Sequence, residues 1–156
     1  MAELEQLYRE HYGQYVRVAS AVVGDEARGV ESVQDAFASA ISSRRKFRRD
    51  GSPEGWLWRI VINAARASRH RMEAIPIDEV TNRFDSMPIA DELGVRRWIA
   101  GLPERQRLVV FLRHFADLDY RSISIALDIE VGTVSATLAS AYANLREVIQ
   151  EVRGHD

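Results

Sequence analysis

The sequence predicts an all-α fold in which an acidic linker joins two small helical domains. Along most of the 156-residue chain, apolar residues recur at the three- and four-residue spacing of amphipathic helices. No segment shows the alternation of apolar and polar residues that is typical of strands. Residues 73–92 lack a helical pattern and contain Pro76, Pro88 and several acids, which favours a linker. We therefore expect one domain at residues 1–72 and another at residues 93–156.

Three helices are expected in the first domain, and together they can bury a shared core. The first runs over about residues 3–23, and the second follows Asp25, a good N-cap, and ends near Ser43. The third starts at Ser52-Pro53, because serine is a favoured N-cap and proline fits the first helical position. In the second helix, the residues expected to face inward are Val30, Val33, Phe37, Ala40 and Ile41.

In the second domain, the helical pattern resumes over about residues 90–100 and again over 103–115. Asp119 is a good N-cap for a short helix over Tyr120–Leu127, and the last helix spans about residues 131–152. A short helix, a tight turn and a second amphipathic helix form a helix-turn-helix, whose second helix reads the major groove in many DNA-binding proteins. The second domain is therefore a candidate DNA reader.

Charge is strongly segregated along the chain, although the net charge is only −2. Residues 44–72 carry nine basic and two acidic residues, together with one phenylalanine and two tryptophans. Arginines interleaved with aromatic rings suit phosphates and unstacked bases, although a solvated helix face is the alternative interpretation. In contrast, the stretch between Arg121 and Arg146 contains no Lys or Arg. The predicted recognition helix can therefore neutralise few DNA phosphates.

The composition argues against several function classes. The absence of cysteine rules out disulfides and thiolate metal sites, and the four histidines are scattered without a metal-binding spacing. No Gly-rich phosphate loop is present, so we expect no enzyme activity, no cofactor and no metal site. No apolar run reaches the roughly 18 residues of a membrane span, and the charged N-terminus is unlike a signal peptide. These features predict a cytoplasmic protein without membrane insertion.

Six segments of the chain resemble one known family. They are LYREHYGQYV, ESVQDAFASA and SPEGWLWRIVINAARASRHR in the first domain, and LPERQRLVVFLRHF, DLDYRSISIAL and GTV in the second. In order and spacing they resemble the extracytoplasmic-function (ECF) branch of the sigma-70 family of bacterial RNA polymerase sigma factors. The resemblance implies a region 2 bundle of three to four helices at residues 1–72 and a region 4 helix-turn-helix at residues 93–156. It also implies core RNA polymerase, promoter DNA and an anti-sigma factor as partners.

The resemblance further implies roles for side chains of the first domain. The helix that carries Val33, Gln34 and Asp35 would dock on the polymerase. The basic loop, at residues 44–52, and the third helix would recognise and melt the −10 promoter element, which needs phosphate neutralisation and a place for an unstacked base. Because Trp56 and Trp58 point to different faces, we expect Trp56 in the core and Trp58 on the DNA side. Phe47 or Asn63 would receive the base, and the residues assigned to −10 DNA are Arg44, Arg45, Lys46, Phe47, Arg48, Trp58, Arg59, Asn63, Arg66 and Arg69.

The second domain departs from the family pattern at three positions. Asp128 stands at the turn where the family usually has glycine, Glu130 stands where it commonly has a serine N-cap, and Ile125 replaces a usually polar residue. We expect Ile125, Val131 and Ala136 to form a small exposed apolar patch. The residues assigned to weak −35 contacts are Arg121, Thr133, Ser135, Ala136, Thr137 and Ser140.

The main prediction is an initiation factor that binds core polymerase and directs it to promoters. The uncharged recognition helix keeps a second function open, namely a sigma-like regulatory protein whose region 4 contacts a protein partner rather than −35 DNA. An anti-sigma factor fits less well because the first domain is strongly basic. A one-component regulator also fits less well, since its helix-turn-helix alone would have to supply the affinity for DNA.

Overall fold

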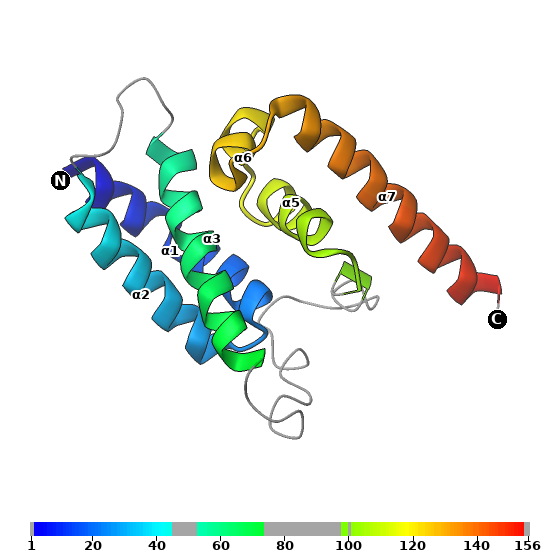
Figure 1. Ribbon diagram of the computed structural model, residues 1–156, viewed down its shortest axis with the longest axis horizontal. Helices are drawn as coiled ribbons and strands as arrows, with labels where there is room; N and C mark the ends of the chain where they lie inside the picture. The colour runs from blue at the N-terminus through cyan, green and yellow to red at the C-terminus, as the bar shows by residue number, and fades with distance from the viewer. Residues whose placement is uncertain (1, 45–52, 74–97, 100, 155–156) are drawn as a thin grey trace.

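The computed structural model describes residues 2–44, 53–73, 98–99 and 101–154 (Figure 1). Within these residues the chain forms helices and no strand, so the all-α prediction is confirmed. The helices, in chain order, are α1 (Ala2–Val23), α2 (Glu26–Ser42), α3 (Pro53–Glu73), α5 (Glu104–His114), α6 (Tyr120–Leu127) and α7 (Val131–Gly154).

Helices α1, α2 and α3 form one bundle around an aromatic centre. Tyr15 and Trp58 are fully buried, and their ring centroids lie 4.6 Å apart. Phe37 of α2 completes the cluster, with its ring centroid 5.3 Å from that of Tyr15. Burial raises the pKa of the Tyr15 phenol far above its usual range, and the negative charge of Glu54 raises it further. Tyr15 therefore stays neutral and acts as a packing residue.

The junction between α1 and α2 depends on a cap and a close approach. The side chain of Asp25 accepts a hydrogen bond from the backbone N–H of Ala27 at 3.0 Å, which confirms its predicted role as N-cap. Gly29, one turn into α2, lies directly against the backbone of Ser20 in α1. A Cβ atom at residue 29 would lie 2.8 Å from both the N and Cα atoms of Ser20. The two helices can therefore pack this closely only because residue 29 is glycine.

The helix-turn-helix forms as its local sequence predicts. Asp119 caps α6 by accepting a hydrogen bond from the backbone N–H of Ser122 at 2.8 Å, and this bond lowers the pKa of its carboxyl group. Asp128 ends α6 in the left-handed conformation, with φ 55° and ψ 51°, which aspartate tolerates better than most residues. Helix α7 then packs Val134, Leu138 and Ala141 against α5 and α6.

Some expectations about individual positions were wrong or fall outside the described residues. Ile41 is not inward but 41% exposed, because it lies at the end of α2 where the bundle no longer covers it. Of the helix expected at residues 90–100, only Trp98 and Ile99 are described, and both are helical. The expected N-cap Ser52 lies outside the described residues. So does the linker expected at residues 73–92, except for Glu73, which is the last residue of α3 and not part of a linker.

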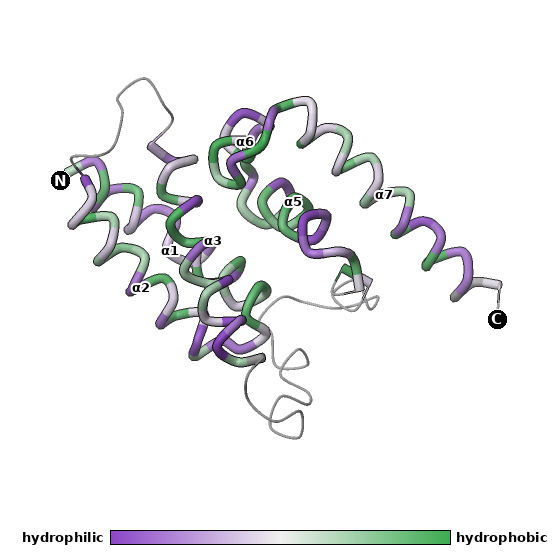
Figure 2. The backbone as a smooth tube through the Cα atoms, in the orientation of Figure 1, coloured by the Kyte–Doolittle hydropathy of each residue, from purple (hydrophilic) through white to green (hydrophobic). Residues whose placement is uncertain are grey.

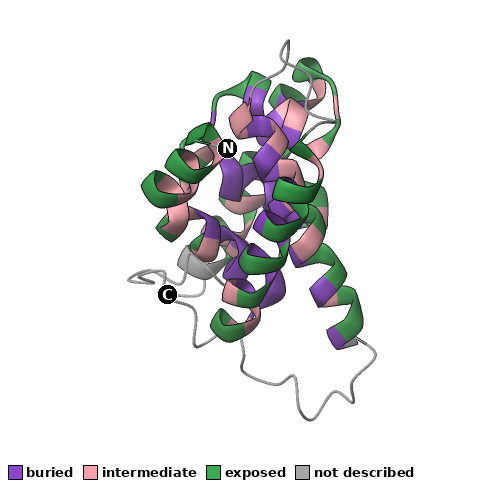
Figure 3. Ribbon diagram, turned by 90° about the vertical axis from the view of Figure 1, so that its left-hand side faces the viewer, coloured by how far each residue is buried: buried purple, intermediate pink, exposed green. Residues whose placement is uncertain are grey.

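Helix α3 lies between the two groups of helices, with α1 and α2 on one side and α5 and α6 on the other (Figure 1). Figure 3 shows the buried residues turned inward between the helices and the exposed residues on the outside. Helix α7 is the outermost helix and carries the C-terminus away from the bundle (Figure 1). No single helix of the described chain is long and apolar enough to span a membrane, and α6 with α7 passes that test only as a pair bent by 98°.

We predict that Gly29→Ala destabilises the fold. The new methyl group would meet backbone atoms of Ser20 that cannot rotate away, and overpacking of this kind costs about 1–3 kcal/mol. Gly13→Ala is the matched control, because Gly13 is an exposed helical residue with nothing near its Cβ position. It should stabilise the protein by up to about 1 kcal/mol through helix propensity. Thermal unfolding followed by circular dichroism measures both; equal melting temperatures would contradict the account.

Candidate nucleic-acid interface

Two arginines on the polar side of α3 face the second group of helices. Arg59 donates from Nε to the carbonyl oxygen of Ile125 at 2.8 Å, and its Nη2 lies 3.3 Å from Oδ1 of Asp128. Arg66 lies seven residues further along α3, which brings it to the same side after about two turns. Its Nε donates to Oε1 of Glu104 at 2.6 Å. Arg59 and Arg66 were both assigned to −10 DNA. In this structure, each of them binds carboxylate or carbonyl oxygens of the same chain.

Arg69 and Arg44 were also assigned to −10 DNA, but they bind backbone oxygens of α1 and α2. Arg69 donates from Nη1 to the carbonyl oxygen of Val22 at 2.9 Å, so it ties α3 to the end of α1. Arg44 is exposed just after α2 and donates to the carbonyl oxygen of Ile41 at 3.0 Å. Four further residues assigned to −10 DNA lie outside the described part of the chain: Arg45, Lys46, Phe47 and Arg48.

The expectation for the two tryptophans was the reverse of what the structure shows. Trp58 is 0% exposed and packs in the bundle core, whereas Trp56 is only partly buried. Trp58 shares one face of α3 with Val61, Ile62 and Ala65, at three-, four- and seven-residue spacing. This periodicity was visible in the sequence, and it assigns Trp58 to the core. Trp58 therefore cannot receive a DNA base in this conformation.

Asn63 is exposed and lines a hollow that Asp35 of α2 also lines. The hollow has a volume of about 410 Å³ between α2 and α3, and its lining includes Asp35, Ser39, Asn63 and Arg71. Asn63 carries both amide donors and a carbonyl acceptor, the combination that pairs with a base edge. The structure thus brings the candidate base contact on α3 next to Asp35, one of the candidate polymerase contacts on α2.

The outer face of α2 presents Gln34 and Asp35 to solvent. Val33, which was assigned to the polymerase with them, is 0% exposed and belongs to the bundle core, so that assignment was wrong. One residue step turns a helix by 100°, which carries Val33 away from the face of its two neighbours. The signal was present in the sequence, because Val33 also lies on the inward stripe of α2.

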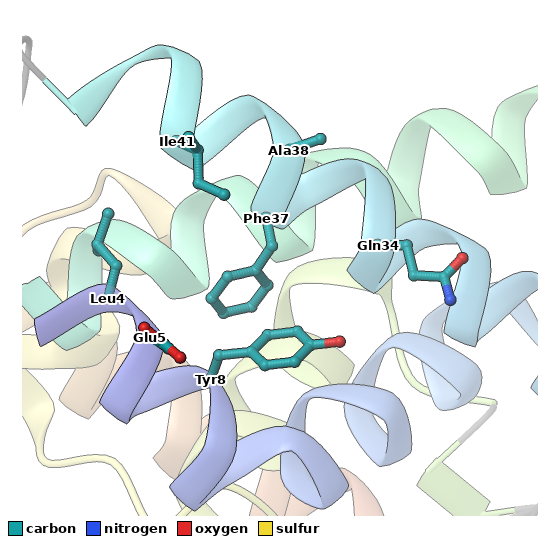
Figure 4. A pocket seen from close by; sticks show the side chains of 7 residues that line it. All are labelled: Leu4, Glu5, Tyr8, Gln34, Phe37, Ala38 and Ile41. Carbon is teal, nitrogen blue, oxygen red and sulfur yellow. The ribbon is translucent and has the colours of Figure 1, made fainter. Parts of the chain in front are cut away.

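An apolar groove of about 420 Å³ runs between α1 and α2 beside Gln34. Figure 4 shows the rings of Tyr8 and Phe37 in the groove, with Leu4 and Ile41 at one end and Gln34 at the other. Glu5 and Ala38 complete its lining. Sequence reasoning missed this groove, because it treated Ile41 as a core residue. The groove therefore adds apolar surface to the side of α2 that carries Gln34.

The first turns of α7 present a neutral surface. Figure 2 shows them in white and green, and strongly hydrophilic residues appear only in the C-terminal half of the helix. Val131 is 46% exposed, as the expected apolar patch requires. Ile125, however, does not join it, because its side chain packs against Gly55 of α3. The residues assigned to −35 DNA are exposed (Arg121, Ser135, Ala136 and Ser140) or half-buried (Thr133 and Thr137).

Two hydrogen bonds between side chains hold α7 against α5, and neither could be predicted from a local sequence pattern. His114 Nε2 and the hydroxyl of Tyr142 lie 2.6 Å apart. Asn144 donates to the side-chain oxygen of Gln106 at 2.8 Å. Burial and the neighbouring charge of Arg113 lower the pKa of His114. His114 is therefore mostly neutral at pH 7 and serves as a hydrogen-bonding partner of α7.

Comparison with known proteins identifies both groups of helices. Residues 7–72 match the family sigma-70 region 2, and residues 92–145 match the family sigma-70 region 4. The chain is 29% identical over 152 residues to "ECF RNA polymerase sigma factor SigM" of Mycobacterium tuberculosis, covering 93% of this chain and 76% of that protein. It is 29% identical over 137 residues to "ECF RNA polymerase sigma-E factor" of Escherichia coli, covering 76% and 72% of the two chains.

A solved structure shares the fold. CnrH, in complex with the cytosolic domain of CnrY, superposes with a TM-score of 0.72 at 21% identity, covering 95% of this chain and 88% of CnrH. The two family matches occur in the order region 2 and then region 4, and together they take up most of the chain. This protein therefore belongs to the sigma-70 family, in its ECF branch.

Proposed function

We propose that this protein is a transcription initiation factor that binds core RNA polymerase and directs it to specific promoters, without catalysing a reaction itself. The observation that carries the proposal is the hollow between α2 and α3. There, Asn63, a candidate base contact, lies beside Asp35, a candidate polymerase contact. We assign residues 1–72 to region 2, 73–92 to the linker and 93–156 to region 4, and the protein to the cytoplasm, where its polymerase acts.

In region 2, the outer face of α2 docks on the polymerase. Gln34 and Asp35 supply polar specificity, and the apolar groove beside them supplies surface that a partner helix can bury. Arg44, Arg59, Arg66 and the basic loop neutralise phosphates of the −10 element, and Asn63 pairs with an unstacked base. Arg69 contributes by fixing α3 on α1 through Val22.

In region 4, α7 reads the −35 element through small side chains. Thr133, Ala136 and Thr137 carry methyl groups that can touch a thymine methyl, while Ser135 and Ser140 offer hydroxyls. Arg121, at the start of α6, is an exposed cation on the helix that precedes α7. With so few charges, region 4 contributes specificity and region 2 supplies most of the electrostatic affinity.

An anti-sigma factor is the third proposed partner. The support comes from CnrH, whose structure is a complex with the cytosolic domain of CnrY. The groove between α1 and α2 offers apolar surface that an amphipathic helix of such a partner could cover.

We predict that the purified protein associates with core RNA polymerase and supports run-off transcription from promoters selected by sequencing the DNA bound with the complex. Gel filtration of the mixture should give a stable holoenzyme. Failure to co-migrate with core polymerase would rule out the proposed function. Co-migration without promoter-dependent transcripts would point to the regulatory alternative.

We predict that Asp35→Lys weakens binding to core polymerase by about tenfold or more, because it places a cation where an exposed anion meets the partner. The matched control is Glu10→Lys, which makes the same charge reversal at an exposed site on α1. Fluorescence anisotropy with labelled polymerase gives both dissociation constants. If the control weakens binding as much as Asp35→Lys does, the assigned docking face is wrong.

We predict that Asn63→Ala lowers promoter melting, since the base loses its hydrogen-bonding partner, at a cost of about 1–3 kcal/mol of discrimination. The salt dependence of promoter binding should stay unchanged, because no phosphate contact is removed. Ser39→Ala, on the α2 side of the same hollow, should leave melting intact. Permanganate footprinting of the open complex measures melting, and equal loss in both variants would contradict a specific role for Asn63.

A further inference from the structure

The outer face of α7 carries only short side chains through its first three turns. Val134, Leu138 and Ala141 are buried against α5 and α6. A residue two places after Val134 lies about 200° around the helix from it, so Ala136 lies opposite the buried stripe. The exposed residues on this outer side are Gly132, Ser135, Ala136, Ala139, Ser140 and Ala143.

The position of this face in the fold, and not the size of its side chains, makes it a DNA contact. Residues 92–145 match sigma-70 region 4, and α7 is the second helix of the helix-turn-helix. In such motifs the first residues of the second helix contact base edges in the major groove, while the first helix crosses the DNA backbone. Helix α7 is also the outermost helix, so its outer face is open to a partner (Figure 1). The short side chains then decide which base edges the helix can recognise.

The described outer face of α7 offers no arginine or lysine to guanine. Guanine presents two acceptors, O6 and N7, in the major groove, and an arginine or lysine side chain binds both at once. The chain has no Lys or Arg between Arg121 and Arg146. Arg146 lies about 15 Å beyond Ala136 along the helix axis, and Arg121 lies on α6, the helix that crosses the DNA backbone. A hydroxyl donates one hydrogen bond only, so Ser135 and Ser140 cannot replace the bidentate contact.

Thymine is the base whose edge suits this face. Its 5-methyl group projects into the major groove, and an alanine methyl group makes a favourable apolar contact with it. Ala136 presents its methyl group at the centre of the outer face, with Gly132 about one turn before it and Ser140 about one turn after it. Because neither neighbour has a long side chain, the backbone of α7 can approach the floor of the groove closely enough for the methyl group of Ala136 to reach a base.

We propose that Ala136 is a specificity-determining residue of region 4, and that it selects thymine in the −35 element by contact with the thymine 5-methyl group. The promoters of this protein then carry a thymine that faces α7, and they need no guanine at the positions that α7 contacts. This selectivity rests on the proposed function, because it specifies which DNA sequence region 4 reads.

The first test removes the methyl group from the DNA. A promoter duplex, taken from the DNA bound with the holoenzyme, is made with deoxyuridine in place of each thymine of the −35 element in turn. Deoxyuridine keeps the base pair and loses only the 5-methyl group. At one thymine the change should weaken binding of the holoenzyme about fourfold, the effect of losing the burial of one methyl group. Replacing each guanine of the element with 7-deazaguanine, which lacks the N7 acceptor, should leave binding unchanged.

Two results of this binding experiment would overturn the proposal. One is that no thymine of the −35 element responds to loss of its methyl group. The other is that a guanine of the element responds to loss of its N7 acceptor. Run-off transcription by the wild-type holoenzyme on the same promoters reports separately on the initiation function, so a failure of base selection is distinguished from a failure of the proposed function.

The second test removes the methyl group from the protein. Ala136→Gly should bind the thymine duplex and the deoxyuridine duplex equally, because the thymine methyl group then has no partner. Ala143→Gly is the matched control, since it makes the same change on the same face of α7, about 10 Å further along the axis. Both variants lose a similar helix propensity, and the control should keep the fourfold preference for thymine. A preference that survives in Ala136→Gly would show that another residue reads the methyl group.

Discussion

Helix α3 packs against two groups of helices, α1 with α2 on one side and α5 with α6 on the other. The arrangement of the molecule follows from this constraint. One face carries Trp58, Val61 and Ala65 into the core shared with α1 and α2. Another face presents Gly55, Arg59 and Arg66 to α6 and α5. Because successive residues turn by 100°, 21 residues provide both faces along the full length of the helix. The helix that carries the candidate −10 contacts is thereby also the helix on which region 4 rests.

The contact between region 4 and α3 combines an ion pair with apolar packing. Region 2 holds the basic block of the chain, whereas the first turns of α7 are neutral (Figure 2). Two of the positions at which region 4 departs from the family pattern, Ile125 and Asp128, both contact α3. One supplies apolar cover for Gly55, and the other supplies a carboxylate for Arg59. These departures therefore have a physical explanation in the packing between the regions rather than in the reading of −35 DNA.

Much of the fold could be predicted from the sequence because it is set locally. Asp25 and Asp119 cap the helices they precede, and Asp128 adopts the left-handed conformation that a tight turn requires. The errors concern faces of helices that meet more than one neighbour. Trp58 was placed on the DNA side and Val33 on the polymerase side, although the helical period puts both in the core. The contact between regions 2 and 4 had no local signal, since Arg59 and Asp128 are far apart in the chain and each is an ordinary surface residue by itself.

In the free protein, region 4 rests on the arginine face of α3 through the contacts of Arg59 and Arg66. The chain contains no cysteine, so cysteines introduced at the exposed positions Glu10 on α1 and Ala143 on α7 would carry the only two spin labels. Because this packing fixes the two regions relative to each other, pulsed electron paramagnetic resonance should then give a single narrow distance distribution in the free protein. A broad distribution would contradict the packing of region 4 on α3.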